Sequence, residues 1–277
     1  MSEPASSPFP SPPDIAREMF GDRLTLAEGY AGWLVGAGVE RGLIGPHEGE
    51  RLWDRHLLNC VAAAALIPMG SSVVDLGSGA GLPGIVLAIA RPDLTVTLVE
   101  SMLRRTAFLE VVVADLGLTG VQVRHARAEE LKKPRLQADV VSARAVAPVD
   151  RLVALAAPLL RPGGQLLALK GAGVVEEVRS GWASVRRAGM VDDAAVLTVR
   201  AAAALPDVAS AGDQLSEPVY LPGVEVFRVM AWEADGTPAP DAHATHPVSP
   251  DADGLALILR LRRVQPGVSR TRQSGLG

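Results

Sequence analysis

The sequence predicts a doubly wound α/β fold with a small helical portion at its N-terminal end, on three observations. From residue 72 onward, short apolar runs alternate with longer amphipathic ones. A glycine-rich turn, VVDLGSGAGLPG at residues 73–84, interrupts the first of these pairs. Residues 14–70 have the apolar spacing of helices instead. Repeated strand–helix–strand units build a parallel sheet with right-handed crossovers, which binds its ligands at the carboxyl ends of the strands.

The N-terminal part is expected to be helical from residue 14 to residue 70. In residues 24–38 and 47–67 apolar side chains recur three and four positions apart, which is the spacing of an amphipathic helix. Pro46 and the neighbouring glycines mark a connection between helices. Residues 1–13 are rich in Pro and Ser, so we expect a disordered leader there.

The alternating part predicts strands and helices in strict succession. The expected strands are 72–76, 94–100, 121–126, 138–146 and 165–171, and the expected helices are 83–92, 102–117, 148–162 and 174–189. Pro162 and the glycine pair after it predict the end of the third helix.

The C-terminal part follows a different pattern. Residues 200–254 are acidic, rich in Ala, Pro and Gly, and without a sustained period, so we expect an insertion containing one or two strands. Residues 254–264 predict a last strand, and residues 265–277 a flexible basic tail. Residues 71–264 are therefore expected to form one catalytic domain.

Composition excludes several classes of protein. The 277 residues are 48% hydrophobic, enough for a full core, but no apolar run approaches the roughly 20 residues of a membrane span. Cys60 is the single cysteine, which excludes an internal disulfide and a cysteine-cluster metal site. We therefore expect a cytoplasmic protein with no membrane and no metal partner.

Charge is distributed unevenly along the chain. The net charge is −4, yet residues 101–190 carry a net +6 and residues 191–254 a net −9. A basic middle segment predicts a face that binds phosphate, and an ordinary solvated surface is the alternative.

The glycine turn predicts a cofactor site. Asp75, Gly77, Gly79 and Gly81 alternate at the end of the first strand, so the backbone is open to a ligand there. A carboxylate at Asp75 is poorly placed for a phosphate and well placed for a cationic amino-acid group. Glu100 ends the second strand, where a carboxylate accepts ribose hydroxyls, although it also has the position of a helix cap. The combination resembles the class I signature of S-adenosylmethionine-dependent methyltransferases, with a nicotinamide enzyme as the alternative.

The end of the fourth strand predicts the acceptor chemistry. Residues 140–148 lack the Asn/Asp-Pro-Pro-aromatic run of amino-group methyltransferases, and Cys60 lies in a helix ahead of the sheet rather than at a nucleophile position. An acceptor that is already nucleophilic, such as guanine N7, needs alignment and no general base. Ser142 and Arg144 are the side chains expected to position it; a structural ion pair is the alternative for Arg144.

The sequence resembles the RsmG family, also called glucose-inhibited division protein B, over residues 51–171. The matching segments are RLWDRHLLNC, VVDLGSGAGLPGIVLAIARPDL, LVES with RRTAFL, ARAEEL, SARAVAP and LLALKG. Departures from the family's pattern are Gly-Leu-Ile at residues 42–44, Leu-Asn-Cys at 58–60, and the long acidic stretch.

The resemblance implies methylation of a guanine N7 in the 530 loop of 16S rRNA, with 16S rRNA or the small ribosomal subunit as partner and S-adenosylmethionine as donor. It implies cofactor contacts at Gly77, Leu82, Glu100, Ala128, Glu129 and Arg144. It places Arg55, His56 and Lys170 on the RNA side, where Arg104 and Arg105 of the basic segment join them. The alternatives are a methyltransferase for a small molecule or a protein, and a non-catalytic ribosome assembly factor with this fold.

Overall fold

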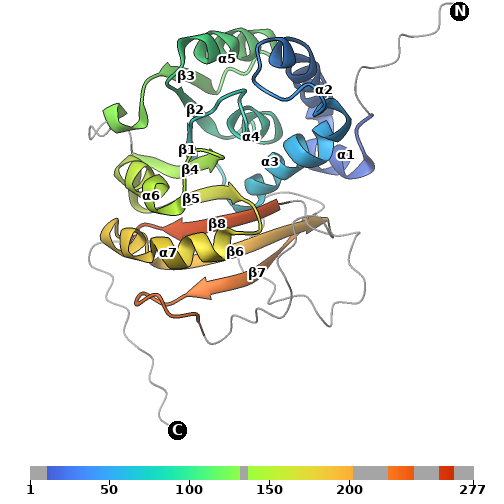
Figure 1. Cartoon of the computed structure of the whole chain (residues 1–277). Coiled ribbons are helices and arrows are strands. Elements are labelled where there is room, and N and C mark those ends of the chain that lie inside the picture. Colours follow the sequence, from blue (N-terminus) through green and yellow to red (C-terminus); the bar gives the residue numbers. More distant parts are fainter. Residues whose placement is uncertain (1–10, 132–136, 202–223, 240–255, 265–277) are drawn as a thin grey trace, which may run out of the picture.

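The described strands form one eight-stranded sheet in the order β3-β2-β1-β4-β5-β8-β6-β7 (Figure 1). The computed structural model describes residues 11–131, 137–201, 224–239 and 256–264. The strands are β1 (Ser72–Leu76), β2 (Thr95–Glu100), β3 (Val121–His125), β4 (Ala138–Arg144), β5 (Leu160–Lys170), β6 (Asp192–Ala201), β7 (Val224–Trp232) and β8 (Ala256–Arg262).

The order of the first five strands locates the ligand-binding edge. These strands are parallel, and β1 lies between β2 and β4. The chain winds outward from β1 in one direction to β3 and then restarts at β4 on the other side. Such a reversal opens a crevice at the carboxyl ends of the two central strands. The glycine turn follows β1 directly, so the fold places it in this crevice.

Helices cover both faces of the sheet. They are α1 (Asp14–Phe20), α2 (Leu24–Trp33), α3 (Asn59–Val61), α4 (Gly84–Ala90), α5 (Leu103–Asp115), α6 (Val149–Ala156) and α7 (Val174–Arg187). Short 3-10 or π-helical segments extend them: η1 (Gly21–Arg23), η2 (Leu34–Gly38), η3 (Gly49–Arg51), η4 (Leu52–Leu58), η5 (Ala62–Leu66), η6 (Ala128–Leu131) and η7 (Ala157–Leu159).

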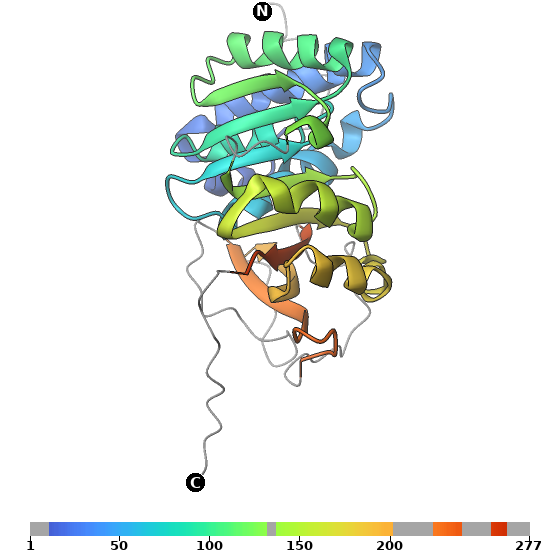
Figure 2. The ribbon, with the colours of Figure 1, turned by 90° about the vertical axis from the view of Figure 1, so that its left-hand side faces the viewer.

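Alternate residues of the central strands face two separate cores. Val73 on β1 packs in one core with the N-terminal helices, α4 and α5, while Val74 packs in the other with α6 and α7. In Figure 2, α6 and α7 lie in front of the sheet and the blue N-terminal helices behind it. Because side chains alternate along a strand, parallel strands buried on both faces are apolar throughout.

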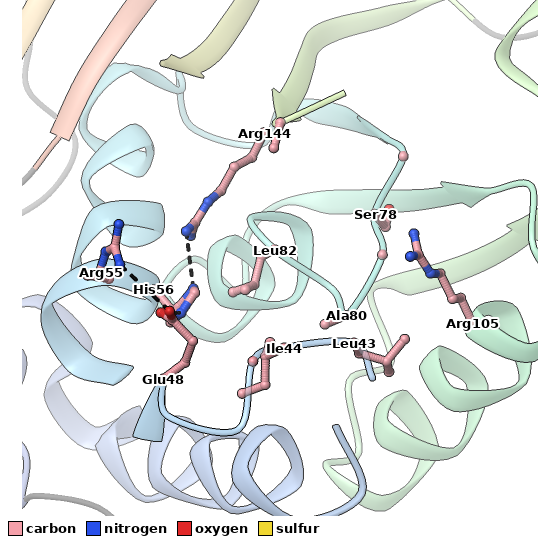
Figure 3. A pocket seen from close by; sticks show the side chains of 14 residues that line it. Leu43, Ile44, Glu48, Arg55, His56, Ser78, Ala80, Leu82, Arg105 and Arg144 are labelled. Atoms are coloured by element: carbon pink, nitrogen blue, oxygen red, sulfur yellow. Dashed lines mark hydrogen bonds and ion pairs between the residues drawn. The ribbon is translucent and has the colours of Figure 1, made fainter. Parts of the chain in front are cut away.

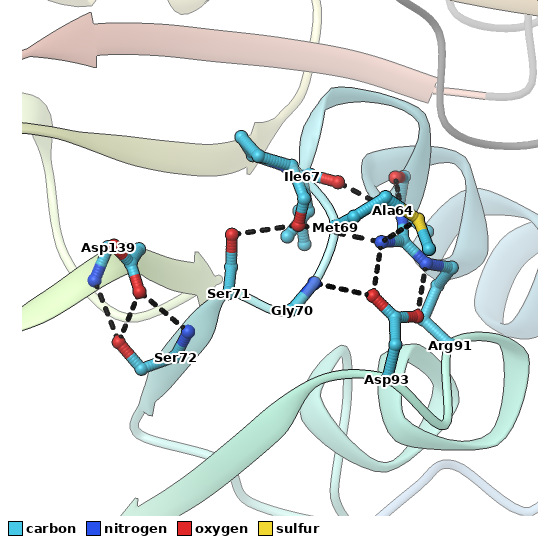
Figure 4. Close-up of polar contacts among 10 residues, drawn as sticks. Ala64, Ile67, Met69, Gly70, Ser71, Ser72, Arg91, Asp93 and Asp139 are labelled. Carbon is cyan, nitrogen blue, oxygen red and sulfur yellow. Dashed lines mark hydrogen bonds and ion pairs between the residues drawn. The ribbon is translucent and has the colours of Figure 1, made fainter.

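A buried arginine ties the N-terminal helices to the sheet (Figure 4). Arg91, 5% exposed, forms a bidentate pair with Asp93 through Nε and Nη2, each at 2.7 Å. Its Nη1 donates to the carbonyl oxygens of Ala64 and Ile67 at 3.2 and 3.0 Å. One guanidinium therefore joins the end of η5 to the turn between α4 and β2.

Two details differ from the expected elements. The helical segment after β4 ends with η7 at Leu159, before Pro162, and β5 begins at once. The reason is that Gly163 and Gly164 already bond to Arg263 beyond β8, at 3.0 and 2.8 Å. Strand β6 was not expected at all, and β8 enters between β5 and β6, antiparallel to both.

Several expected segments fall outside the described residues. These are most of the leader, the basic tail, and residues 202–223 and 240–255 of the acidic insertion. Strand β7 lies within that insertion. Among the described helices, none combines the length and apolarity needed to cross a membrane.

Candidate functional site

The glycine turn is held in place by Asp75 from below. Asp75 is fully buried, and its Oδ2 accepts the Gly84 N–H at 3.2 Å while its Oδ1 accepts the Ser142 hydroxyl at 2.8 Å. A Cβ at Gly84 would lie 2.3 Å from Cδ2 of Leu98 and 2.8 Å from Oδ2 of Asp75. Glycine is therefore required where α4 begins, because helix and strand approach too closely for a side chain.

Burial gives Asp75 an unusual acidity. Desolvation is the largest effect and raises its pKa to about 6, while hydrogen bonds from Ser78, Ser142 and Gly84 oppose it. Asp75 and Ser142 are both fully buried, and neither is among the residues that line the two cavities beside the turn. Their roles toward cofactor and acceptor stay predictions, and the structure gives both a direct role in shaping the turn.

A cavity of about 420 Å³ opens beside the turn (Figure 3). Residues that are far apart in the sequence line it: Leu43, Ile44, Gly45, Glu48, Arg55, His56, Gly77, Ser78, Gly79, Ala80, Leu82, Arg105, Arg144 and Ala145. Tyr30 of α2 supports the turn from behind, because its buried hydroxyl donates to the Ala80 carbonyl at 2.9 Å. The N-terminal helices therefore form one wall of the cavity and also hold the turn.

A second, smaller cavity of about 220 Å³ shares Gly77 with the first as a lining residue. Ala128 and Glu129, which follow β3, line it together with Val146 and Arg151. Gly77 has a φ of +65°, and a Cβ there would lie 3.0 Å from Cγ2 of Val146. Glycine at this position therefore lets the backbone turn without a side chain pressing on Val146 between the two cavities.

Glu100 at the end of β2 is 4% exposed and fixes the turn from the side. Its Oε2 accepts the Gly79 N–H at 3.0 Å, and its Oε1 accepts the Met102 N–H at 2.8 Å. Met102 is the N-cap residue of α5, and this helix has no side-chain cap, so the bond to its N–H ties Glu100 to the start of α5 without capping it. A ribose contact by Glu100 stays a prediction beside these two bonds.

Arg144 reaches into the larger cavity without an acidic partner. Its Nη1 donates to Sγ of Cys60 at 3.1 Å and its Nη2 to Nδ1 of His56 at 3.1 Å. No ion pair joins it to a carboxylate of the described residues. The structural ion pair considered above is therefore not found in this part of the chain, and the guanidinium charge faces the cavity uncompensated.

Cys60 lies at the end of β4 in space, although it belongs to α3. The sequence predicts Cys60 in a helix ahead of the sheet, which α3 confirms, and packing brings that helix to Arg144. Its exclusion as a nucleophile holds for a different reason. The thiol is fully buried, desolvation raises its pKa to about 11, and it does not line the cavity.

The two arginines of α5 differ. Arg105 lines the larger cavity, with Nη1 3.9 Å from Oε2 of Glu100, and its buried Nε has no hydrogen-bond partner in the described structure. Arg104 is exposed. Of these two arginines, only Arg105 therefore lines the cavity.

Of the other residues expected on the RNA side, two line the larger cavity and one does not. Arg55 and His56 line the larger cavity. Lys170 does not: its Nζ donates to Oε2 of Glu177 at 2.7 Å and to the Ala147 carbonyl at 3.0 Å, and its side chain is 11% exposed. Its contact with phosphate stays a prediction, and the structure shows it bound within the fold.

The residues present fit S-adenosylmethionine. Two cavities that share Gly77 flank the glycine turn, and the larger one is lined by Arg144, whose guanidinium has no carboxylate partner among the described residues and is suited to a ligand carboxylate. Ala128 and Glu129 line the smaller cavity, and their contact with the cofactor stays a prediction. Among the described residues, no group of three or more His, Cys, Asp or Glu side chains is placed to hold a metal ion.

Several lining residues escaped the sequence analysis. Leu43 and Ile44 stand out in the sequence only as a departure from the family's pattern, and Glu48 lies in a range with helical spacing. Ala145 has a φ of +54°, rare for a residue with a side chain. The sequence shows a glutamate, Glu48, eight positions before His56, but this spacing does not predict that the two side chains form a hydrogen bond.

The comparisons with known proteins agree with this geometry. The model of the GidB family, described as rRNA small subunit methyltransferase G, matches residues 23–205. A ribosomal RNA small subunit methyltransferase G from Salinispora tropica is 59% identical over 191 residues, covering 67% of this chain and 79% of that protein. Its counterpart from Nocardioides sp. is 57% identical over 190 residues, covering 68% and 76%.

A solved structure adds a more distant likeness. An S-adenosylmethionine-dependent O-methyltransferase from Thermotoga maritima is 14% identical, with a TM-score of 0.45, over 76% of this chain and 66% of that one. The class I methyltransferase fold of this chain rests on its strand order and its family. With a matching family model over more than half its length, this chain belongs to the GidB family, the rRNA small subunit methyltransferases G.

Proposed function

We propose that this chain transfers a methyl group from S-adenosylmethionine to N7 of a guanine in the 530 loop of 16S rRNA. The observation that carries the proposal is that the turn of the family's methyltransferase domain and the uncompensated Arg144 open onto one cavity. S-adenosylmethionine supplies a methyl group on a positively charged sulfur, which any aligned lone pair attacks.

The acid and base groups of the cavity support an acceptor that needs no deprotonation. Glu48 and His56 are bonded to each other at 2.8 Å, and Asp75 is sealed beneath the turn. Guanine N7 carries its own lone pair, so this chain has only to hold the base in line and limit water. Arg144 is the side chain we assign to orienting the base or the cofactor carboxylate.

Basic side chains at the cavity support an RNA partner. Arg55, with half of its side chain exposed, lies on the wall formed by η4, and Arg105 lies on the wall formed by α5. Charges of this kind bind phosphates without reading sequence, while the cavity selects the base. A guanine must leave its stack to enter, which favours a partly single-stranded loop. We place this activity in the cytoplasm, with free rRNA or the small subunit as substrate.

Methyl transfer from labelled S-adenosylmethionine tests the proposal. The substrates are 16S rRNA and small subunits that lack the modification, and the modified nucleotide is mapped afterwards. One N7-methylated guanine in the 530 loop is the expected result. Labelling of another nucleotide refutes the assigned site, and cofactor binding without labelled RNA supports a small-molecule or protein substrate.

A further inference from the structure

A chain of three side chains crosses the wall of the larger cavity (Figure 3). Oε2 of Glu48 lies 2.8 Å from Nε2 of His56, and Nδ1 of His56 lies 3.1 Å from Nη2 of Arg144. The three come from the turn before η3, from η4 and from the end of β4. Glu48, 8 positions from His56 in the sequence, and Arg144, 88 positions from it, thus both bond to the His56 imidazole.

The chemistry of the two ends fixes the tautomer of the ring. Arg144 has only donors, so Nδ1 of His56 must be an unprotonated acceptor. Glu48 as a carboxylate has only acceptors, so Nε2 must carry the proton. Both ends therefore select the same neutral imidazole, with hydrogen on Nε2 alone.

We propose that Glu48 is a positioning residue for methyl transfer, acting through the tautomer and orientation of His56 on Arg144. The proposal rests on the function proposed above, because Arg144 is assigned to the reacting partners there. Without Glu48 the ring has no anchor at Nε2 and is free to rotate or change tautomer. A proton on Nδ1 would then face the guanidinium, and Arg144 would leave its position.

The surroundings of His56 support a neutral ring. The charged groups facing it are Glu48, Arg55 on η4 and Arg144, and the ring is 9% exposed. Burial and then Arg144 lower the pKa of His56, whereas the bond to Glu48 opposes them. The hydrogen bond from His56 in turn lowers the pKa of Glu48, which stays ionised.

The pH profile separates positioning from mere support. Protonation of His56 puts a second donor against Arg144, so the rate falls on the acid side as His56 becomes charged. Glu48→Gln removes the charge that stabilises the imidazolium. Because an amide offers Nε2 a donor as well as an acceptor, Gln also no longer selects the tautomer with hydrogen on Nε2. We therefore expect a lower plateau, by about 10-fold or more, together with an acid limb displaced to lower pH. A role in folding alone would lower the plateau and leave the limb in place.

The experiment compares matched variants of the full chain. Glu48→Gln is measured against Glu50→Gln, an exposed neighbour outside the cavity, and against Glu48→Asp, which keeps the charge. Glu50→Gln is expected to retain the wild-type rate and profile, and Glu48→Asp to recover the wild-type acid limb. In a His56→Gln background, Glu48→Gln should cost nothing more. The proposal would be overturned by equal rates for Glu48→Gln and Glu50→Gln, or by an acid limb that does not move in Glu48→Gln. A further loss of rate on adding Glu48→Gln to His56→Gln would also overturn it.

A second readout needs no RNA. Nitrogen-15 NMR of the imidazoles, with the His56 signals identified by His56→Gln, reports the tautomer directly. We expect wild-type His56 to carry hydrogen on Nε2 and to titrate at a higher pH than in Glu48→Gln. Hydrogen on Nδ1, or identical titration in both proteins, overturns the proposal. A wild-type protein that shows this tautomer but methylates no rRNA refutes the proposed function instead.

Discussion

Replacing Asp75 by Asn is expected to stabilise the protein at neutral pH. The amide has the shape of the carboxylate and keeps both bonds: its oxygen accepts the Gly84 N–H, and its NH2 donates to the Ser142 hydroxyl. What it loses is the cost of a buried charge. Asp75 has a pKa of about 6 when folded, against about 3.9 in an unfolded chain.

The size of the effect follows from these two pKa values. The folded state holds a proton on Asp75 more tightly than the unfolded state does. The contribution of Asp75 to the free energy of unfolding is therefore greatest below pH 4 and falls as pH rises toward 6. A difference of about 2 between the pKa values corresponds to roughly 3 kcal/mol above pH 6. Asn does not titrate, so the variant gains this amount at pH 7.5 and almost nothing at pH 4. For a chain of this size the gain raises Tm by about 5–10 °C.

Thermal unfolding of both proteins from pH 4 to pH 8 measures the difference. Asp139→Asn is the matched control with opposite sign, because bonds from Ser72 and Arg161 lower the pKa of Asp139 and its contribution is lost as pH falls. A variant at Asp75 that melts below the wild type at pH 7.5, or a Tm difference that does not change between pH 4 and pH 6, would refute the reasoning.

Three further predictions concern the turn, the cavity and the N-terminal helices. Gly84→Ala inserts a Cβ 2.3 Å from Leu98, so we expect a loss of about 1–3 kcal/mol in denaturant unfolding, and an unchanged midpoint would contradict the close approach. Arg144→Ala removes a guanidinium held by neutral acceptors, so unfolding should change by about 1 kcal/mol or less while turnover falls about 100-fold; a steep fall in Tm with normal turnover would indicate a structural role. Arg91→Met removes the guanidinium that donates to Asp93 and to two buried carbonyls, so a loss of about 2–4 kcal/mol is expected by the same unfolding assay. Retention of wild-type stability is the contrary result.

The parallel half of the sheet could be predicted from the sequence because each of its elements has a local cause. Alternating apolar runs make β1 to β5, and the glycines mark the turn that only an unsubstituted backbone can form. Glu100 and Asp75 were identified as important from their places at strand ends. Their bonding partners, Gly79 and Ser142, could not be read in advance because they depend on how the turn folds back.

The other half of the sheet has no comparable local signal. Strand β6 lies between β7 and β8, so both of its edges are paired, and its residues from Ala194 to Val199 lack a polar alternation. The entry of β8 between β5 and β6 joins strands separated by long stretches of chain. Pairing between such distant segments is a property of the folded chain, and no pattern within one contiguous segment specifies it.

The sequence alone determined the fold class, the cofactor turn and the family resemblance, because all three are properties of contiguous segments. Tertiary structure alone decided what surrounds Arg144. It brings Sγ of Cys60, 84 positions away, to Nη1 of Arg144, and Nδ1 of His56, 88 positions away, to Nη2. It also places Glu48 at the other nitrogen of the imidazole. Hydrogen bonds act over about 3 Å, so the groups that set the charge and orientation of a side chain are chosen by packing in space, whatever their distance along the chain.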